Sequence, residues 1–193
     1  MANSSYKVEL FKPSDAEGVA RLFIEVYGNE YPQKMVYDPE QLIAAFKSGE
    51  NIPVVARTES GQIIAYGALY RSTPNKAVYE IGQAMVLPEY RRTAVFGLLS
   101  RRLAIIAPAL PGVETAFCES VCNHTDTQKA GVFFKYIEAS IEVDLMPAEA
   151  YEKEQSAAGR VSAINMFRTF IPKPHTVYIP DSYDDCFRYI YEG

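Results

Sequence analysis

Two adjacent arginines, Arg91 and Arg92, follow an apolar segment that ends at Val86-Leu87-Pro88. This segment has the composition of a buried strand, and helical spacing of apolar residues begins near Thr93. A helix N-terminus presents unpartnered backbone N–H groups and the positive end of the helix dipole, so it attracts anions. Arginine adds fixed charge and paired donors that match phosphate oxygens. The stretch predicts a phosphate-binding turn; an ordinary strand–loop–helix connection with exposed arginines is the alternative.

Hydrophobic periodicity predicts the elements that would position this turn. Strands are expected at 7–11, 52–57, 62–70, 77–86, 113–121, 138–145 and 161–170. Helices are expected from a capping box at 14–17 to Gly28, from Asp38 to Gly49, from Thr93 to Pro108, and from Thr125 through Tyr136. A tail adds a short strand at 176–179 and a helix from Asp181 or Ser182 to Tyr191. The order is strand, two helices, three strands, helix, strand, helix, two strands.

The bulk composition limits the class of protein. A chain of 193 residues with 48% hydrophobic residues is long enough for one domain with a sizeable core. A net charge of −5 argues against a general nucleic-acid binder. The longest apolar stretch, 103–113, contains two prolines and is too short to cross a membrane. Three cysteines lack the spacing of a zinc site or a disulfide framework, so we expect no metal and a cytoplasmic location.

The pattern Val86-x-Pro88-x-Tyr90-Arg91 resembles the signature of the GCN5-related N-acetyltransferase (GNAT) superfamily, and the order of elements is similar too. The resemblance implies an α/β (α+β) fold, in which helices flank a mixed, mostly antiparallel sheet. It further implies an acyl-CoA-binding domain at 1–170, with a C-terminal extension at 171–193 packed on it. The sequence departs from the family in one respect. Alternating glycines usually follow the arginine, whereas Arg92, Ala94 and Phe96 stand here and the nearest glycine is Gly97.

The resemblance implies acetyl-CoA or another acyl-CoA as co-substrate. The pantetheine arm would lie between the strand that ends at Val86 and the strand that begins at Val113, and the turn would wrap the pyrophosphate. A backbone N–H near Val86 would polarise the thioester carbonyl. The expected CoA-binding residues are Met85, Val86, Arg91, Arg92, Thr93, Ala94, Val95, Phe96, Gly97, Asn123, Thr127 and Lys129.

Two residues are candidates for proton transfer in a direct reaction within a ternary complex. Glu80 occupies the position where many family members keep a carboxylate, and it could deprotonate the acceptor amine through water. An exposed edge residue or a structural ion pair is the alternative for Glu80. Tyr136 could protonate the leaving thiolate, although a packed aromatic would satisfy the same pattern.

Two functions of different classes remain open. The first is an N-acyltransferase that acts on a small-molecule or peptide amine. The second is a catalytically degenerate GNAT-like module that senses acyl-CoA or regulates a partner, which the missing glycines favour. The sequence favours neither a nucleic acid nor a membrane as partner. The aromatic-rich tail beyond Phe170 could form the face of a homodimer.

Overall fold

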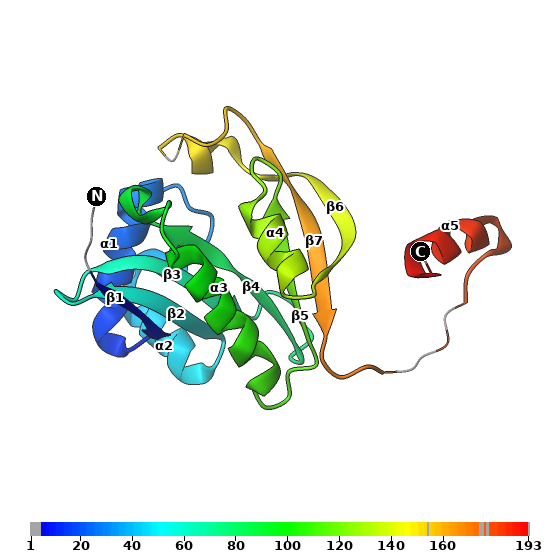
Figure 1. Cartoon of the computed structure of the whole chain (residues 1–193), viewed down its shortest axis with the longest axis horizontal. Coiled ribbons are helices and arrows are strands. Elements are labelled where there is room, and N and C mark those ends of the chain that lie inside the picture. The colour runs from blue at the N-terminus through cyan, green and yellow to red at the C-terminus, as the bar shows by residue number, and fades with distance from the viewer. Residues whose placement is uncertain (1–4, 154, 174–175, 177, 193) are drawn as a thin grey trace.

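A computed structural model describes residues 5–153, 155–173, 176 and 178–192. Within these residues, seven strands form one sheet in the order β1-β2-β3-β4-β5-β7-β6 (Figure 1). Only β4 and β5 run parallel to each other, so the predicted mixed, mostly antiparallel sheet is confirmed. The strands are β1 (Tyr6–Leu10), β2 (Asn51–Thr58), β3 (Ile63–Tyr70), β4 (Val78–Val86), β5 (Thr115–Val121), β6 (Ile137–Met146) and β7 (Val161–Thr169).

The described residues form five α-helices besides the sheet, and short 3-10 turns join several of the elements. The helices are α1 (Ala16–Tyr27), α2 (Pro39–Ser48), α3 (Val95–Ile106), α4 (Asp126–Phe133) and α5 (Asp184–Glu192). The 3-10 turns are η1 (Pro13–Asp15), η2 (Lys34–Tyr37), η3 (Pro88–Tyr90), η4 (Ala107–Ala109), η5 (Ala148–Tyr151) and η6 (Asp181–Tyr183). Within the described residues, no helix has the length and apolar character needed to cross a membrane.

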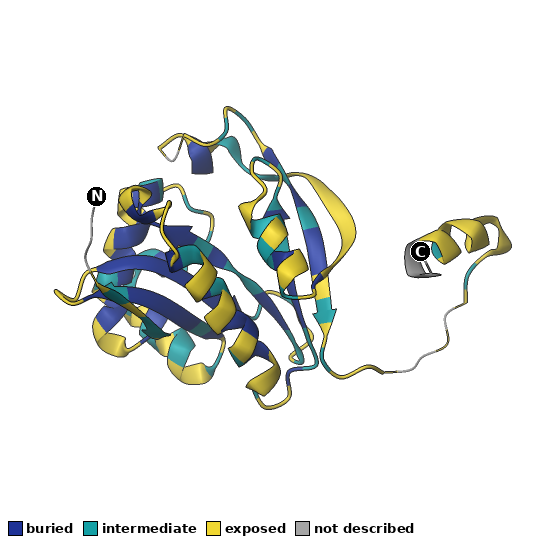
Figure 2. Ribbon diagram, in the orientation of Figure 1, coloured by how far each residue is buried: buried dark blue, intermediate teal, exposed yellow. Residues whose placement is uncertain are grey.

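The helices cover the sheet from both sides. Phe23 of α1 packs on Tyr66 of β3, with ring centroids 5.3 Å apart. On the opposite face, α3 lies against Gly67, where an added Cβ would come within 3.0 Å of Leu103. Figure 1 shows α3 and α4 crossing in front of the strands. The core therefore lies on both faces of β2, β3 and β4, which are buried for most of their length (Figure 2).

The sheet opens between β4 and β5. Their ladder joins only Val78–Glu80 to Thr115–Phe117. On its other edge, β4 pairs with β3 through a β-bulge at Gln83, whose φ of +55° lies in the left-handed region. A bulge bends its strand and redirects the following backbone groups. The residues of β4 after Glu80 have no ladder partner on β5, and those up to Ala84 border an opening in the middle of the sheet.

Several element ends differ from the sequence prediction. The capping box predicted at 14–17 is wrong, because α1 begins only at Ala16. The Asp15 carboxylate instead accepts a hydrogen bond of 2.8 Å from the Lys12 N–H and ends the turn η1. Asp38 caps α2 as predicted, by accepting from the N–H groups of Glu40 and Gln41. Helix α4 ends at Phe133, three residues before the predicted limit.

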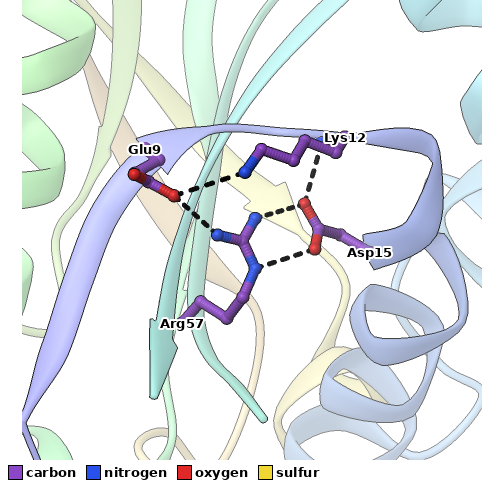
Figure 3. Close-up of polar contacts among 4 residues, drawn as sticks. All are labelled: Glu9, Lys12, Asp15 and Arg57. Atoms are coloured by element: carbon purple, nitrogen blue, oxygen red, sulfur yellow. Dashed lines mark hydrogen bonds and ion pairs between the residues drawn. The ribbon is translucent and has the colours of Figure 1, made fainter. Parts of the chain in front are cut away.

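A charge network ties the N-terminal elements together (Figure 3). Arg57 of β2 donates to both oxygens of Asp15, at 2.9 and 2.6 Å, and to Glu9 of β1 at 2.8 Å. Asp15 is buried, and the Arg57 side chain is only 18% exposed. Two-pronged arginine–carboxylate pairs are among the stronger polar contacts in proteins. The network fixes the start of α1 against β1 and β2.

Replacing Asp15 with alanine is expected to lower the free energy of unfolding by about 2 to 3 kcal/mol, because Arg57 loses its two-pronged partner inside the protein. Urea denaturation measures the change. Glu17→Ala is the matched control, because its pair with Arg21 is exposed and 3.4 Å long and is worth less than about 0.5 kcal/mol. Equal losses for the two variants would contradict a structural role for the network.

The tail differs from its sequence prediction in one element and matches it in another. Thr176, Tyr178 and Ile179 belong to no strand, and residue 177 of the predicted 176–179 strand lies outside the described residues. The helix predicted at 181–191 is present as η6 and α5. Helix α5 lies away from the sheet (Figure 1). This arrangement does not display the packing of residues 171–193 on the domain, which stays a prediction.

Candidate functional site

One cavity of about 370 Å³ lies where β4 and β5 separate. Its lining comes from both faces of the sheet. Phe96 and Ser100 of α3 and Gly131 of α4 line one side, and Tyr31 and Gln33, which follow α1, line the other. A cavity that passes through a sheet gives two molecules access to the same point from opposite sides. Among the predicted site residues, it brings together Glu80, Phe96, Asn123, Thr127 and Tyr136.

Glu80 lines this cavity from the face of the sheet that carries α1. It pairs in register with Tyr70, whose hydroxyl donates a hydrogen bond to its Oε1. The side chain is 5% exposed and has no salt bridge within the described residues. Burial raises the pKa of Glu80 above its ordinary value, and hydrogen bonds from Ser72 and Tyr70 oppose that rise. The two alternatives for Glu80, an exposed edge residue and a structural ion pair, are therefore wrong for the described residues. A buried carboxylate of raised pKa is suited to accept a proton.

Tyr136 enters the cavity from the opposite face. It follows α4 rather than lying in it, and its N–H donates to the Gly131 carbonyl at 2.9 Å. The residue is 5% exposed, yet its buried hydroxyl has no hydrogen-bond partner within the described residues. Burial is the main cause that raises the pKa of Tyr136, with a further contribution from Cys118. The hydroxyl therefore stays protonated near neutral pH and is free to donate.

The turn at 91–94 is exposed and leads into α3. Ala94 is the N-cap residue of α3, and its side chain has no hydrogen-bond acceptor, so the first amides of α3 lack the partners that a capped helix would supply. Val95 is an exception, because its N–H donates to Thr93 Oγ1 at 3.3 Å and its side chain is buried. A Cβ added at Gly97 would meet no atom within 4 Å, so the first turn has open space beside it. The residues present fit a phosphate group, despite the missing glycines.

Met85 and Val86 end β4 and lie outside the cavity lining, which reaches only Ala84. Both side chains are buried. The Val86 carbonyl accepts a hydrogen bond from Arg91 Nε at 3.3 Å. A pantetheine arm placed along this backbone would have to displace Arg91 from that carbonyl.

No family model and no curated protein sequence matches the chain significantly. Solved structures do match its fold. An N-acetyltransferase from Staphylococcus aureus Mu50 aligns with a TM-score of 0.67 and 14% identity, over 86% of this chain and 99% of its own. The ribosomal-protein-S18-alanine N-acetyltransferase from Escherichia coli aligns with a TM-score of 0.62 and 16% identity, over 91% and 100%. A dodecameric spermidine N-acetyltransferase from Vibrio cholerae aligns with a TM-score of 0.63 and 12% identity, over 86% and 94%.

The chain has the GNAT fold. The resemblance read from the sequence is thereby confirmed at the level of architecture, with the β4–β5 opening and the turn before α3 both present. At identities of this size, the alignments establish the fold and leave the chemistry to be argued from the site.

Only some residues of the segment 123–129 line the cavity of this GNAT fold. Asn123 and Thr127 line the cavity, and each has a buried oxygen without a partner within the described residues. Lys129 is exposed and does not line it. His124 caps α4, because its Nδ1 accepts from the Asp126 N–H at 3.3 Å, whereas Thr125 makes no side-chain cap.

Sequence reasoning missed several cavity residues of this GNAT fold. Glu119 was detectable in principle, because it is the single charged residue in the strand Thr115–Val121. Gln83 offered no signal, since its place depends on the bulge. It accepts from the Tyr66 hydroxyl at 3.1 Å and donates to Gln33. Burial raises the pKa of Cys118 to about 11, so this cavity thiol stays protonated. Within the described residues, no group of His, Cys, Asp and Glu is placed to hold a metal ion.

Proposed function

We propose that the chain is an acyl-CoA-dependent N-acyltransferase, with acetyl-CoA as the expected donor and a primary amine as the acceptor. One observation carries the proposal: a single cavity through the sheet contacts a buried carboxylate, Glu80, and the unpartnered hydroxyl of Tyr136. The GNAT fold adds support, because the matching structures include N-acetyltransferases of a ribosomal protein and of spermidine.

The proposed reaction needs two proton transfers. The amine nitrogen attacks the thioester carbonyl carbon, a C–N bond forms, and the C–S bond breaks. The proton that the amine releases goes to Glu80, directly or through a water molecule. The CoA sulfur takes a proton from the Tyr136 hydroxyl. Tyr136 then recovers a proton from solvent and Glu80 releases its proton to solvent, so that both groups are restored. Base and acid lie on opposite faces of the sheet, so each would serve one of the two reactants.

The donor would be held by the turn and the start of α3. Arg91, Arg92 and the uncapped amides near Ala94, Phe96 and Gly97 supply positive charge and donors for the pyrophosphate. Val95 would contribute less, since its N–H already donates to Thr93. Asn123 and Thr127 have free oxygens that could accept from the pantetheine amides. Met85 and Val86 would bind only through backbone groups.

The double substitution Arg91→Ala and Arg92→Ala is expected to weaken binding of acetyl-CoA about 10- to 100-fold, because it removes two charge-assisted contacts to phosphate. Isothermal titration calorimetry with acetyl-CoA, free CoA and a long-chain acyl-CoA measures the effect. Loss of affinity for all three ligands would support a role at the shared pyrophosphate.

The double substitution Arg101→Ala and Arg102→Ala is the matched control. It removes the same charge from exposed positions on α3, outside the cavity lining. An equal loss of affinity in this control would mean that net charge, rather than the turn, attracts CoA. Unchanged affinity in the Arg91 and Arg92 variant would remove the turn from the donor site.

A catalytically degenerate acyl-CoA sensor is the second candidate. The contact between Arg91 and the Val86 carbonyl favours it, because this contact occupies backbone that the donor would need. Tight binding of acetyl-CoA, without release of free thiol in the presence of a panel of amines, would favour the sensor over the enzyme.

The proposal also includes the cellular compartment of the protein and its oligomeric state. Cys118, Cys122 and Cys186 are all free, which agrees with the reducing cytoplasm as the proposed compartment. The tail exposes Tyr178, Tyr183 and Tyr189, and we propose it as a homodimer face. Size-exclusion chromatography with light scattering, with and without residues 171–193, checks the second point.

A further inference from the structure

Three glutamates face the same side of the sheet beside the opening. The parallel ladder pairs Glu80 of β4 with Phe117 of β5, and Glu119 lies two residues further along the same face. The next ladders pair Glu119 with Asn165 of β7 and place Ser140 and Glu142 of β6 next to Asn165. Glu80 and Glu119 both line the cavity. The face that carries α1 thus bears a row of carboxylates that begins at the proposed base and runs outward.

Glu119 has no compensating charge. No hydrogen bond or salt bridge joins its side chain to any other described residue. Burial, followed by repulsion from Glu80 and Glu142, raises the pKa of Glu119 to about 7. No lysine or arginine occurs among the described residues that line the cavity. An ionised carboxylate in this setting is stabilised by a nearby positive charge, which none of the described lining residues supplies.

Asn165 gives an independent indication of a missing donor. It is 8% exposed and donates through Nδ2 to Ser140 at 3.2 Å and to Glu142 at 2.9 Å. Its Oδ1 is buried and has no partner within the described residues. The amide nitrogen is used on the β6 side, and Glu119 is the register partner of Asn165 on the β5 side. Buried acceptors without donors are uncommon, and here they adjoin an unpaired carboxylate.

The opposite wall of the cavity suits a cation as well. Tyr27 and Tyr31 line it, with ring centroids 5.0 Å apart. Burial raises the pKa of Tyr31 well above its ordinary value, and repulsion from Tyr27 and Glu80 adds to the rise. Aromatic faces attract ammonium groups that have left water. The three carboxylates are not arranged as a metal site within the described residues.

We propose that this face is a subsite for a second ammonium group, so that the preferred acceptor is a diamine rather than a monoamine. The proposal rests on the proposed function for the role of Glu80, since one nitrogen of the acceptor must lie at the proposed base. The other nitrogen lies at Glu119, with Glu142 and Asn165 behind it. Adjacent strands lie about 4.8 Å apart and two residues along a strand span about 6.6 Å, so Glu80 and Glu119 are separated by about 8 Å or more, a span that a four-carbon chain covers.

Calorimetric titration of the whole chain with 1,4-diaminobutane and with n-butylamine tests the subsite without any turnover. We expect the diamine to bind at least about 10-fold more tightly than the monoamine, and added salt to reduce the difference. Glu119→Gln keeps the shape and removes the charge, so it should abolish the preference. Glu142→Gln should reduce it partly. Glu138→Gln removes an exposed carboxylate outside this row and should leave it unchanged.

Equal affinity for the two amines in the unsubstituted protein would overturn the subsite, and so would an undiminished preference in Glu119→Gln. Circular dichroism confirms that this variant is folded, and the exposed Glu142 variant gives a second reading that does not depend on core packing. The dipeptide Gly-Lys presents a similar pair of charges. Tighter binding of Gly-Lys than of the diamine would support the subsite and identify a peptide as the source of the charges.

The two proposals fail in distinguishable ways. Selective binding of the diamine without any acyl transfer would support the subsite and contradict the proposed enzyme. Acyl transfer to n-butylamine as efficient as transfer to the diamine would support the enzyme and overturn the subsite.

Discussion

Glu80→Gln is expected to lower kcat/KM for acyl transfer by about 100- to 10,000-fold, the usual contribution of a general base. Glutamine has the shape of glutamate and can still accept from Tyr70, so affinity for acetyl-CoA should stay unchanged. Initial-rate measurements of thiol release, paired with calorimetry of donor binding, separate the two effects. A variant that loses turnover and donor binding together would point to a structural role for Glu80.

The pH dependence gives Glu80 a second test. Its pKa is raised by burial, and the protonated carboxyl cannot accept the proton of the amine. The kcat/KM of the unsubstituted protein should therefore fall as pH drops through a value above the ordinary glutamate pKa, and Glu80→Gln should lose this acid limb. Glu138→Gln, which removes an exposed carboxylate of β6, is the matched control and should keep both the rate and the limb. Turnover that Glu80→Gln leaves unaltered would exclude this residue from the mechanism.

Tyr136→Phe is expected to lower kcat by about 100-fold while it leaves stability unchanged or raised. The hydroxyl is buried and unpartnered, and removal of such a group relieves a desolvation cost of about 1 kcal/mol or more. A general acid and a packed aromatic thus predict different outcomes. Unchanged turnover in a more stable variant would identify Tyr136 as packing alone.

Tyr79→Phe is the control for the tyrosine test, because its hydroxyl is fully used. It donates to the Gly49 carbonyl at 2.9 Å, accepts from Arg71 at 2.8 Å, and lies outside the cavity lining. This variant should lose about 1 to 2 kcal/mol of stability and keep its turnover. Thermal denaturation and rate measurements on both variants should therefore give opposite pairs of changes.

The order of elements was predictable because apolar periodicity and capping residues are local signals. Asp38 before Pro39 and Gly49 after Ser48 show this well, since cap and stop both act within one helical turn. The predicted capping box at 14–17 failed because Asp15 is drawn into the contact with Arg57, 42 residues away. Local propensity cannot reveal a partner that only the folded sheet brings near.

The site was predictable only where it depends on chain order. Glu80 and Tyr136 reach the same cavity because the strand and the turn that carry them flank the opening of a fold visible in the sequence. Glu119 and Asn165 escaped notice because their importance arises from ladder register across three strands. The place of Gln83 in the cavity depends on its own positive φ, which hydrophobic periodicity does not indicate.

The lining of the cavity from both faces of the sheet has a consequence for how such an enzyme cycles. If the donor enters beside α3 and the acceptor beside α1, as the proposed function requires, the two reactants do not share a path, and neither has to bind before the other. The architecture then imposes no compulsory order on the steady state. Each product would then compete only with the substrate that binds on the same face of the sheet. A high concentration of one substrate would not block binding of the other.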